Sequence, residues 1–258
     1  MDLQLKGKTA IVTGGSAGIG LAITKALAAE GVTVTVPGRS KDKLDKALAG
    51  ISNVKPIVAD PGTAEGADDL IQQIPDTDIL INNLGIYEPK PFAEITDADW
   101  LKIFEVNVLS GVRLSRHYFP RMLERNWGRV IFISSESGIM TPPEMIHYGV
   151  TKSSQLAISR GLAELTKGTA VTVNTVMPGP TRSEAIVEFL AKMSTAKNPT
   201  SEQAEKEFFE KHRQSSLLQR LIEGDEIASF VAFIASPLSA ATNGAALRAE
   251  GGLLRSIS

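Results

Sequence analysis

Short apolar segments alternate with helical segments along most of this chain, and no other feature constrains the fold as strongly. The expected strands cover residues 8–14, 32–36, 54–60, 78–83, 128–135 and 170–179. Helical spacing of apolar residues lies between them, at about 18–31, 41–50, 63–74, 97–125 and 145–166. Continuously apolar strands that alternate with helices indicate a parallel sheet covered on both faces. We therefore predict an α/β fold built on a doubly wound parallel sheet.

No linker, repeat or low-complexity tract interrupts this alternation, so residues 1–258 are expected to form a single domain. One segment departs from the pattern. Residues 181–218, which follow the sixth expected strand, are charged and helix-prone. They are consistent with a solvated helical hairpin and equally with a substrate lid, because ligands of open α/β sheets bind beyond the carboxyl ends of the strands.

Composition excludes several classes of function. The chain contains no cysteine, which rules out disulfides, thiolate nucleophiles and cysteine metal sites. His117, His147 and His212 are scattered without metal-ligand spacing, so we expect no metal. A formal net charge of −2, with neither a polybasic run nor a long apolar stretch, argues against nucleic-acid and membrane partners. We expect a cytoplasmic metabolic protein.

A glycine-rich loop, TGGSAGIG (13–20), joins the first expected strand to the first helix. Its glycines would let the backbone turn sharply and approach a ligand, and the following helix N-terminus suits a phosphate. The spacing of Gly14, Gly18 and Gly20 differs from the G-x-G-x-x-G of many dinucleotide sites. The loop also contains G-x-S-x-G around Ser16, the nucleophile elbow of serine hydrolases. That competing interpretation is weakened because the loop follows the very first strand and no histidine is marked as the base.

The end of the second expected strand indicates which dinucleotide is bound. An acid there usually binds the ribose 2′-hydroxyl of NAD(H), whereas a nearby arginine accommodates the 2′-phosphate of NADP(H). This chain has no acid at the strand end and instead has Gly38 followed by Arg39. A guanidinium binds a phosphate through two parallel hydrogen bonds. We predict that NADP(H) is preferred, with NAD(H) as a possible alternative.

Tyr148 and Lys152 stand four residues apart in a segment that reads as a helix, so their side chains share one face. An ordinary half-buried face would account for such a pair. The pair would also suit proton transfer, because a nearby cation favours the ionised form of a phenol that normally titrates near pH ~10.

Taken together, these segments resemble the short-chain dehydrogenase/reductase family over nearly the whole chain. The motifs are TGGSAGIG (13–20), NNLG (82–85), Asn107 in FEVNVLSG, ISSESG (133–138), YGVTK (148–152) and MPGPTRS (177–183). Each motif is modest alone, but their order and distances are highly specific. Residues 220–252 also resemble the C-terminal part of the family. The resemblance implies a Rossmann-like dinucleotide-binding fold.

The resemblance also implies roles for individual residues. Tyr148 would deliver the proton to the carbonyl oxygen, and Ser135 would hydrogen-bond that same oxygen. Lys152 would lower the pKa of the tyrosine and bind the nicotinamide ribose, while Asn107 would hold a water in a proton relay. The implied cofactor-binding residues are Gly14, Ser16, Ala17, Gly18, Ile19, Gly20, Arg39, Asp60, Asn83, Leu84, Gly85, Tyr148, Lys152, Pro178, Gly179, Thr181 and Ser183.

The sequence therefore favours an oxidoreductase that transfers a hydride between NADP(H) and a small carbonyl or alcohol substrate. Two alternatives remain, a dinucleotide-binding regulator without turnover and the serine hydrolase. Reduction of acyl thioesters, oxidation of sugars and reduction of ketones are all open. By analogy with the family we expect a homotetramer, with a dimer as the second choice.

Overall fold

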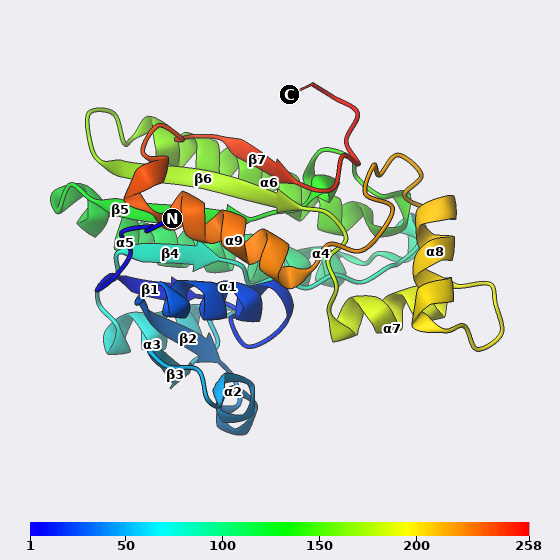
Figure 1. Ribbon diagram of the computed structural model, residues 1–258, viewed down its shortest axis with the longest axis horizontal. Helices are drawn as coiled ribbons and strands as arrows, with labels where there is room; N and C mark the ends of the chain where they lie inside the picture. The colour runs from blue at the N-terminus through cyan, green and yellow to red at the C-terminus, as the bar shows by residue number, and fades with distance from the viewer. Residues whose placement is uncertain (258) are drawn as a thin grey trace.

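The computed structural model describes residues 1–257, which contain one seven-stranded sheet in which every paired strand is parallel. The strand order is β3-β2-β1-β4-β5-β6-β7, so the order reverses between β1 and β4 (Figure 1). The strands are β1 (Thr9–Val12), β2 (Thr33–Gly38), β3 (Val54–Val58), β4 (Ile79–Asn82), β5 (Gly128–Ile133), β6 (Val171–Pro178) and β7 (Ala246–Ala249). This is the predicted doubly wound, Rossmann-like sheet.

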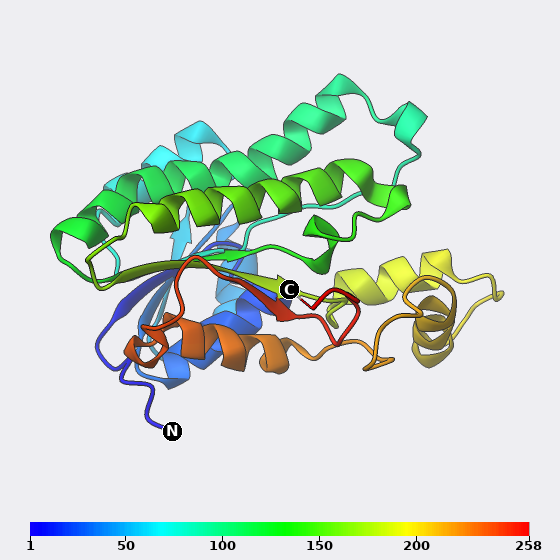
Figure 2. The ribbon, with the colours of Figure 1, turned by 90° about the horizontal axis from the view of Figure 1, so that it is seen from above.

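Helices cover both faces of the sheet, as Figure 2 shows from above. The helices are α1 (Gly18–Ala29), α2 (Lys41–Leu48), α3 (Ala64–Gln73), α4 (Asp97–Phe104), α5 (Ser110–Glu124), α6 (Ile146–Glu164), α7 (Glu184–Met193), α8 (Ser201–Lys211) and α9 (Gly224–Ala235). Helices α1, α2 and α9 belong to one hydrophobic core, and α3, α5 and α6 belong to the other. The sheet lies between these two layers.

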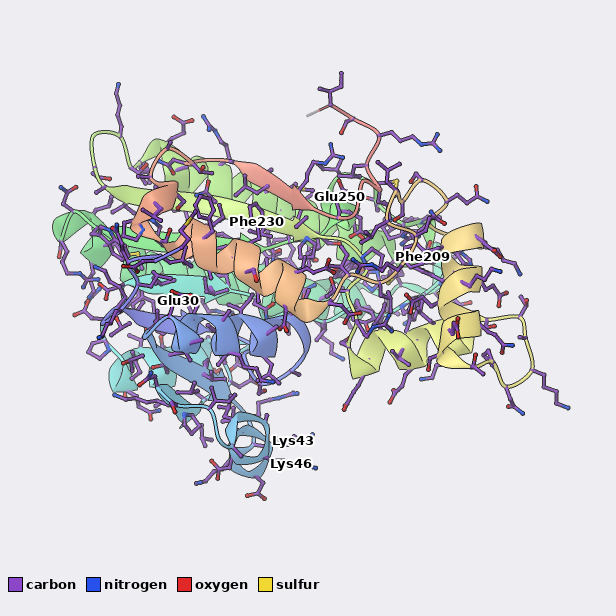
Figure 3. All side chains as sticks on the ribbon, in the orientation of Figure 1. Glu30, Lys43, Lys46, Phe209, Phe230 and Glu250 are labelled. Atoms are coloured by element: carbon purple, nitrogen blue, oxygen red, sulfur yellow. The ribbon has the colours of Figure 1, made fainter. Side chains whose placement is uncertain are left out.

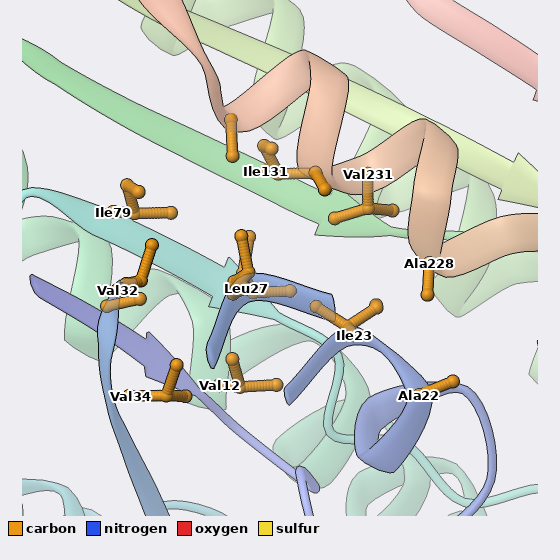
Figure 4. Packing of buried hydrophobic residues seen from close by; sticks show 14 of the residues in the cluster. Val12, Ala22, Ile23, Leu27, Val32, Val34, Ile79, Ile131, Ala228 and Val231 are labelled. Carbon is orange, nitrogen blue, oxygen red and sulfur yellow. The ribbon is translucent and has the colours of Figure 1, made fainter. Parts of the chain in front are cut away.

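Successive residues of the central strands pack into opposite cores, which explains why the strands are apolar throughout. In β4, Ile79 and Ile81 join the core under α1 and α9, whereas Leu80 joins the core under α5. Side chains of a strand alternate between its two faces, so a sheet covered on both sides buries every position. Figure 4 shows Leu27 of α1 and Val231 of α9 in the first of these cores.

The long helix expected at about 97–125 is interrupted. Helix α4 ends at Phe104, a π-helical turn, η2 (Glu105–Leu109), follows, and α5 continues from Ser110. Such single-turn insertions into an α-helix occur frequently at functional sites. Asn107 lies in this turn.

The insertion at 181–218 forms helices α7 and α8, which pack on each other around a small core of their own. Leu190 of α7 and Phe208 and Phe209 of α8 belong to that core. Figure 1 shows both helices beyond the carboxyl ends of the strands. Among residues 1–257, no helix is both long enough and apolar enough to cross a bilayer.

Candidate functional site

A cavity of about 960 Å³ opens at the carboxyl ends of the central strands. It is lined by the loop after β1, by residues 83–85 after β4, by Ser134–Ser137 after β5 and by the segment after β6. Side chains of α7 and of the stretch 208–213 complete its wall. The cavity thus lies where the strand order reverses, the usual ligand position in an open α/β sheet.

The loop after β1 has the shape of a phosphate cradle. Gly14 and Gly18 have positive φ angles of 64° and 49°, which disfavour any residue with a side chain. Helix α1 begins directly after Ala17, an N-cap that makes no side-chain hydrogen bond to the helix. The amides of its first turn therefore remain available to an anion, and the helix dipole favours one there. These residues fit the diphosphate of a dinucleotide.

Residues 82–85 hold this loop in place. The Asn83 amide donates to the carbonyl of Thr13 at 2.9 Å, and the Thr13 hydroxyl accepts from the backbone N–H groups of Asn83 and Leu84. All predicted cofactor residues of the glycine loop, of residues 83–85 and of residues 178–183 line the cavity. Arg39, Asp60 and Lys152 are not among the described residues that line it.

Ser135 and Tyr148 meet at the base of the cavity. Ser135 caps the start of the short 3₁₀ turn Glu136–Gly138 that follows β5, and Tyr148 lies in the first turn of α6, within hydrogen-bonding reach of Ser135. Burial raises the pKa of Tyr148, the nearby Glu136 carboxylate raises it further, and the hydrogen bond with Ser135 opposes the rise. The phenol is therefore protonated at neutral pH and could serve as a proton donor.

Lys152 lies behind this pair, where a Cβ on Gly85 would approach its Nζ to 3.6 Å. Nζ donates to the Ile133 carbonyl at 2.8 Å and to Gln155 Oε1 at 3.3 Å. Burial lowers the pKa of Lys152 to about 8, although Glu136 opposes the change. The resemblance implies that Lys152 lowers the pKa of Tyr148. That role stays a prediction, because burial and the Glu136 carboxylate dominate the pKa of Tyr148 in this structure.

Asn107, in the π-helical turn η2, makes several hydrogen bonds. Its side chain accepts from the backbone N–H of Ile86 at 2.7 Å, and it donates to the Ile86 carbonyl at 2.9 Å and to the Thr151 hydroxyl at 3.0 Å. Its backbone carbonyl accepts from Gln155 Nε2 at 2.6 Å. Gln155 thus bridges the backbone carbonyl of Asn107 and Nζ of Lys152.

The predicted adenosine residues lie at the outer end of β2 and β3. The Arg39 side chain is 83% exposed, and its Nε is 3.9 Å from the Asp60 carboxylate. A contact this long and exposed contributes little, so the guanidinium remains free to bind a ligand. Lys43 and Lys46 of α2, labelled in Figure 3, line the cavity and supply further positive charge.

Ser16 lines the cavity, but the histidines lie elsewhere. His117 contacts the Pro75 carbonyl, His147 packs against Trp100, and His212 stacks on Phe208. Within residues 1–257, Ser16 therefore has no imidazole base. The geometry does not favour the serine hydrolase.

Three buried polar residues at the site were not singled out from the sequence: Glu136, Gln155 and Arg213. Glu136 follows Ser135 directly, and Gln155 lies seven residues after Tyr148, a spacing that places it on the same helix face. These two could have been found from local spacing. Arg213 comes from the end of the insertion, and only the tertiary fold brings it to Glu136.

Comparison with known proteins agrees with this arrangement. The family model described as short chain dehydrogenase matches residues 8–193. An uncharacterized oxidoreductase, YvaG of Bacillus subtilis, is 50% identical, with 100% of each chain covered. The crystal structure of L-sorbose reductase from Gluconobacter frateurii, complexed with NADPH and L-sorbose, is 26% identical with a TM-score of 0.92 and 100% of both chains covered. A putative NAD(P)-dependent gluconate 5-dehydrogenase from Beutenbergia cavernae, with bound NADP at low occupancy, is 26% identical with a TM-score of 0.86, covering 99% of this chain and 100% of the other.

Proposed function

Because the chain belongs to the short-chain dehydrogenase/reductase family, an NAD(P)-dependent family of oxidoreductases that act on CH–OH and C=O groups, we propose that it reduces a small ketone or aldehyde with NADPH. The observation that carries this proposal is the meeting of Ser135 and Tyr148 in the same cavity as the phosphate cradle. The reverse reaction, oxidation of the alcohol, uses the same groups.

In the proposed reaction, each of the cavity residues has a separate role. NADPH, when bound, supplies the hydride. Tyr148 donates its phenolic proton to the carbonyl oxygen as negative charge develops there, and Ser135 hydrogen-bonds that oxygen. Lys152, held by the Ile133 carbonyl and Gln155, places a positive charge beneath the tyrosine.

Preference for NADPH rests on the charges around the end of β2. No carboxylate stands at Gly38 to hold a ribose 2′-hydroxyl, whereas Arg39, Lys43 and Lys46 are all exposed cations near the cavity mouth. A 2′-phosphate would find up to three positive partners there. Two related structures were determined with the phosphorylated cofactor, NADPH in one and NADP in the other, which supports the same assignment.

The test is Tyr148→Phe, which removes the proton donor and keeps the ring. NADPH binding, followed by cofactor fluorescence, should persist, while carbonyl reduction should fall by about 10²–10⁴-fold, as is typical for loss of a general acid. Tyr118→Phe is the matched control, because Tyr118 is a buried tyrosine that donates to the Ile74 carbonyl and does not line the cavity among the described residues. Near-normal turnover in a folded Tyr148→Phe protein would contradict the assignment.

The second candidate, a dinucleotide-binding regulator, makes the opposite prediction for the unchanged protein. It would bind NADPH but reduce no member of a broad carbonyl panel. The pairing of Ser135 with Tyr148 favours the enzyme, because cofactor binding alone does not require a proton donor in the cavity.

A further inference from the structure

Glu136 and Arg213 form a charged pair on the substrate side of the cavity. Both line the cavity, yet their side chains are only 6% and 10% exposed. Glu136 follows β5, whereas Arg213 is carried by the end of the insertion. Burial of two ionic groups is costly unless the surroundings satisfy their hydrogen bonds. The hydrogen bonds of this pair therefore influence which substrate groups the cavity can bind.

The pair leaves one donor unsatisfied. Arg213 Nη1 donates to the His212 carbonyl at 2.9 Å, and Nη2 lies 3.7 Å from Glu144. Arg213 Nε is buried and has no hydrogen-bond partner among residues 1–257. The nearest carboxylate oxygen, Glu136 Oε1, is 3.9 Å away, which is beyond direct hydrogen-bonding distance. A buried donor without a partner carries a full desolvation cost.

A hydroxyl group can complete this pair, although two atoms 3.9 Å apart leave no room for an oxygen on the line between them. A hydroxyl oxygen beside that line, about 2.8 Å from each atom, accepts from Arg213 Nε and donates to Glu136 Oε1. Because Nε is buried, the Arg213 side chain must rotate slightly to open it to the cavity. A carboxylate in the same place would be repelled by Glu136. A methyl group would leave both charged partners unpaired.

The gap lies close to the reacting oxygen. Without substrate, Ser135 donates its hydroxyl proton to the other oxygen of the same carboxylate, Glu136 Oε2, and this hydroxyl must turn to the carbonyl oxygen when a substrate binds. Ser135 is also the neighbour of Tyr148. A group bound at Oε1 therefore lies farther from the serine than Oε2 does, by about the distance between the two oxygens of one carboxylate. This position corresponds to a substituent on the carbon next to the carbonyl, or on the following carbon.

Aromatic rings also line the cavity. Tyr87 packs edge-on against Tyr148 and against Phe189 of α7, with ring centroids 6.1 and 6.2 Å apart, and all three rings line the cavity. The cavity therefore offers apolar surface as well as the donor–acceptor pair. Such a site suits a short carbon chain that carries a hydroxyl group.

We propose that Glu136 and Arg213 recognise a hydroxyl group adjacent to the reacting carbonyl, so that the substrates are hydroxyketones and the products are vicinal diols or polyols. This inference rests on the proposed reductase function and names its substrate class. The two residues determine specificity, while the proton transfer remains with Tyr148.

Hydroxyacetone and butanone are matched probes, because they differ only by a hydroxyl in place of a methyl group. The measured quantity is the ratio of their kcat/KM values with NADPH. Comparing this ratio between variants cancels the difference in intrinsic reactivity of the two ketones. The unchanged protein should prefer hydroxyacetone.

Arg213→Met removes the unsatisfied donor and keeps an apolar contact to Phe208. It should lower the ratio by at least about tenfold, the usual effect of one lost hydrogen bond to a charged group, because hydroxyacetone loses a contact that butanone never makes. Glu136→Gln is the second variant and should also lower the ratio. Glu144→Gln is the control, because Glu144 also lies beside Arg213 but does not line the cavity among the described residues. It should leave the ratio unchanged.

The outcomes separate this inference from the proposed function. If both Arg213→Met and Glu136→Gln retain the original ratio, or lower both kcat/KM values equally, the hydroxyl site is wrong although the enzyme remains a reductase. Reduction of neither probe by a protein that binds NADPH overturns both proposals. If the hydroxyacetone-to-butanone ratio falls in both variants while NADPH binding persists, the hydroxyl site is supported.

Discussion

Single residues around the end of β2 should set the cofactor preference. A charge-assisted contact to phosphate contributes about 1.5–3 kcal/mol, or roughly tenfold to a hundredfold in affinity. NADPH should therefore bind more tightly than NADH by about that factor, and salt should narrow the difference because Arg39 is exposed. Arg39→Ala should weaken NADPH binding and leave NADH binding nearly unchanged, as measured by fluorescence titration.

Two lysines of α2 refine this measurement. Lys43→Ala should weaken NADPH binding to a smaller degree, because Lys43 lines the cavity. Lys41→Ala is the matched control: Lys41 lies on the same helix, but it already pairs with Asp45. Equal affinity of the unchanged protein for NADH and NADPH would show that Arg39 is only a surface arginine.

Introducing an acid at Gly38 is not a simple reversal of this preference. A Cβ at Gly38 would lie 2.9 Å from Leu44 Cδ2, and Leu44 is buried in the core. A larger residue would therefore displace α2 side chains as well as add charge. Sequence spacing identified the missing carboxylate at this position, but it could not show the packing that excludes one.

At the level of single residues, sequence motifs identified the site residues whose spacing along the chain is fixed. They missed the residues that only the tertiary fold brings to the site. Tyr148 and Ser135 were found because their motifs have a fixed order, and the fold brings them together in the cavity. Arg213 was missed because no local pattern distinguishes it among the many charges of the insertion. Its burial depends on the path of the chain after α8, which only tertiary packing determines.

Among the secondary-structure elements, the π-helical turn η2 should contribute measurably to stability. Asn107→Ala would leave both the N–H and the carbonyl of Ile86 without their side-chain partner. The free energy of unfolding in urea should fall by about 1–3 kcal/mol. Gln73→Ala is the matched amide control, since Gln73 is exposed at the end of α3 and should change stability by less than about 0.5 kcal/mol. Equal effects of the two substitutions would mean that Asn107 does not anchor this loop.

The regular elements were predictable because their burial is regular. Strands buried on both faces read as apolar runs, and the six expected strands are all present. The turn η2 was not predicted, because its residues continue the helical pattern of α4 and α5. Strand β7 was not predicted either: ALRA has no continuous apolar run, and pairing with β6 makes it a strand.

For the whole molecule, the resemblance predicts assembly through the layer that contains α4, α5 and α6. Figure 2 shows these helices side by side on the outer face. Leu101 of α4 and Leu165, which caps the end of α6, are 72% and 64% exposed, and Phe104 and Val150 are exposed as well. Large apolar side chains on one face mark a surface that another protein covers. A second copy of this chain is the expected partner, because most oligomers of this kind are symmetric homo-oligomers.

Light scattering at micromolar concentration should therefore give four times the mass of the chain, or twice that mass if only one two-fold interface forms. Leu101→Asp combined with Phe104→Asp should shift the protein to a smaller species, because buried carboxylates without partners oppose association. Val58→Asp provides the control: Val58 is also exposed, but it lies on β3 at the far edge of the sheet. A monomeric unchanged protein, or loss of assembly in the Val58 variant alone, would contradict pairing through α4 and α6.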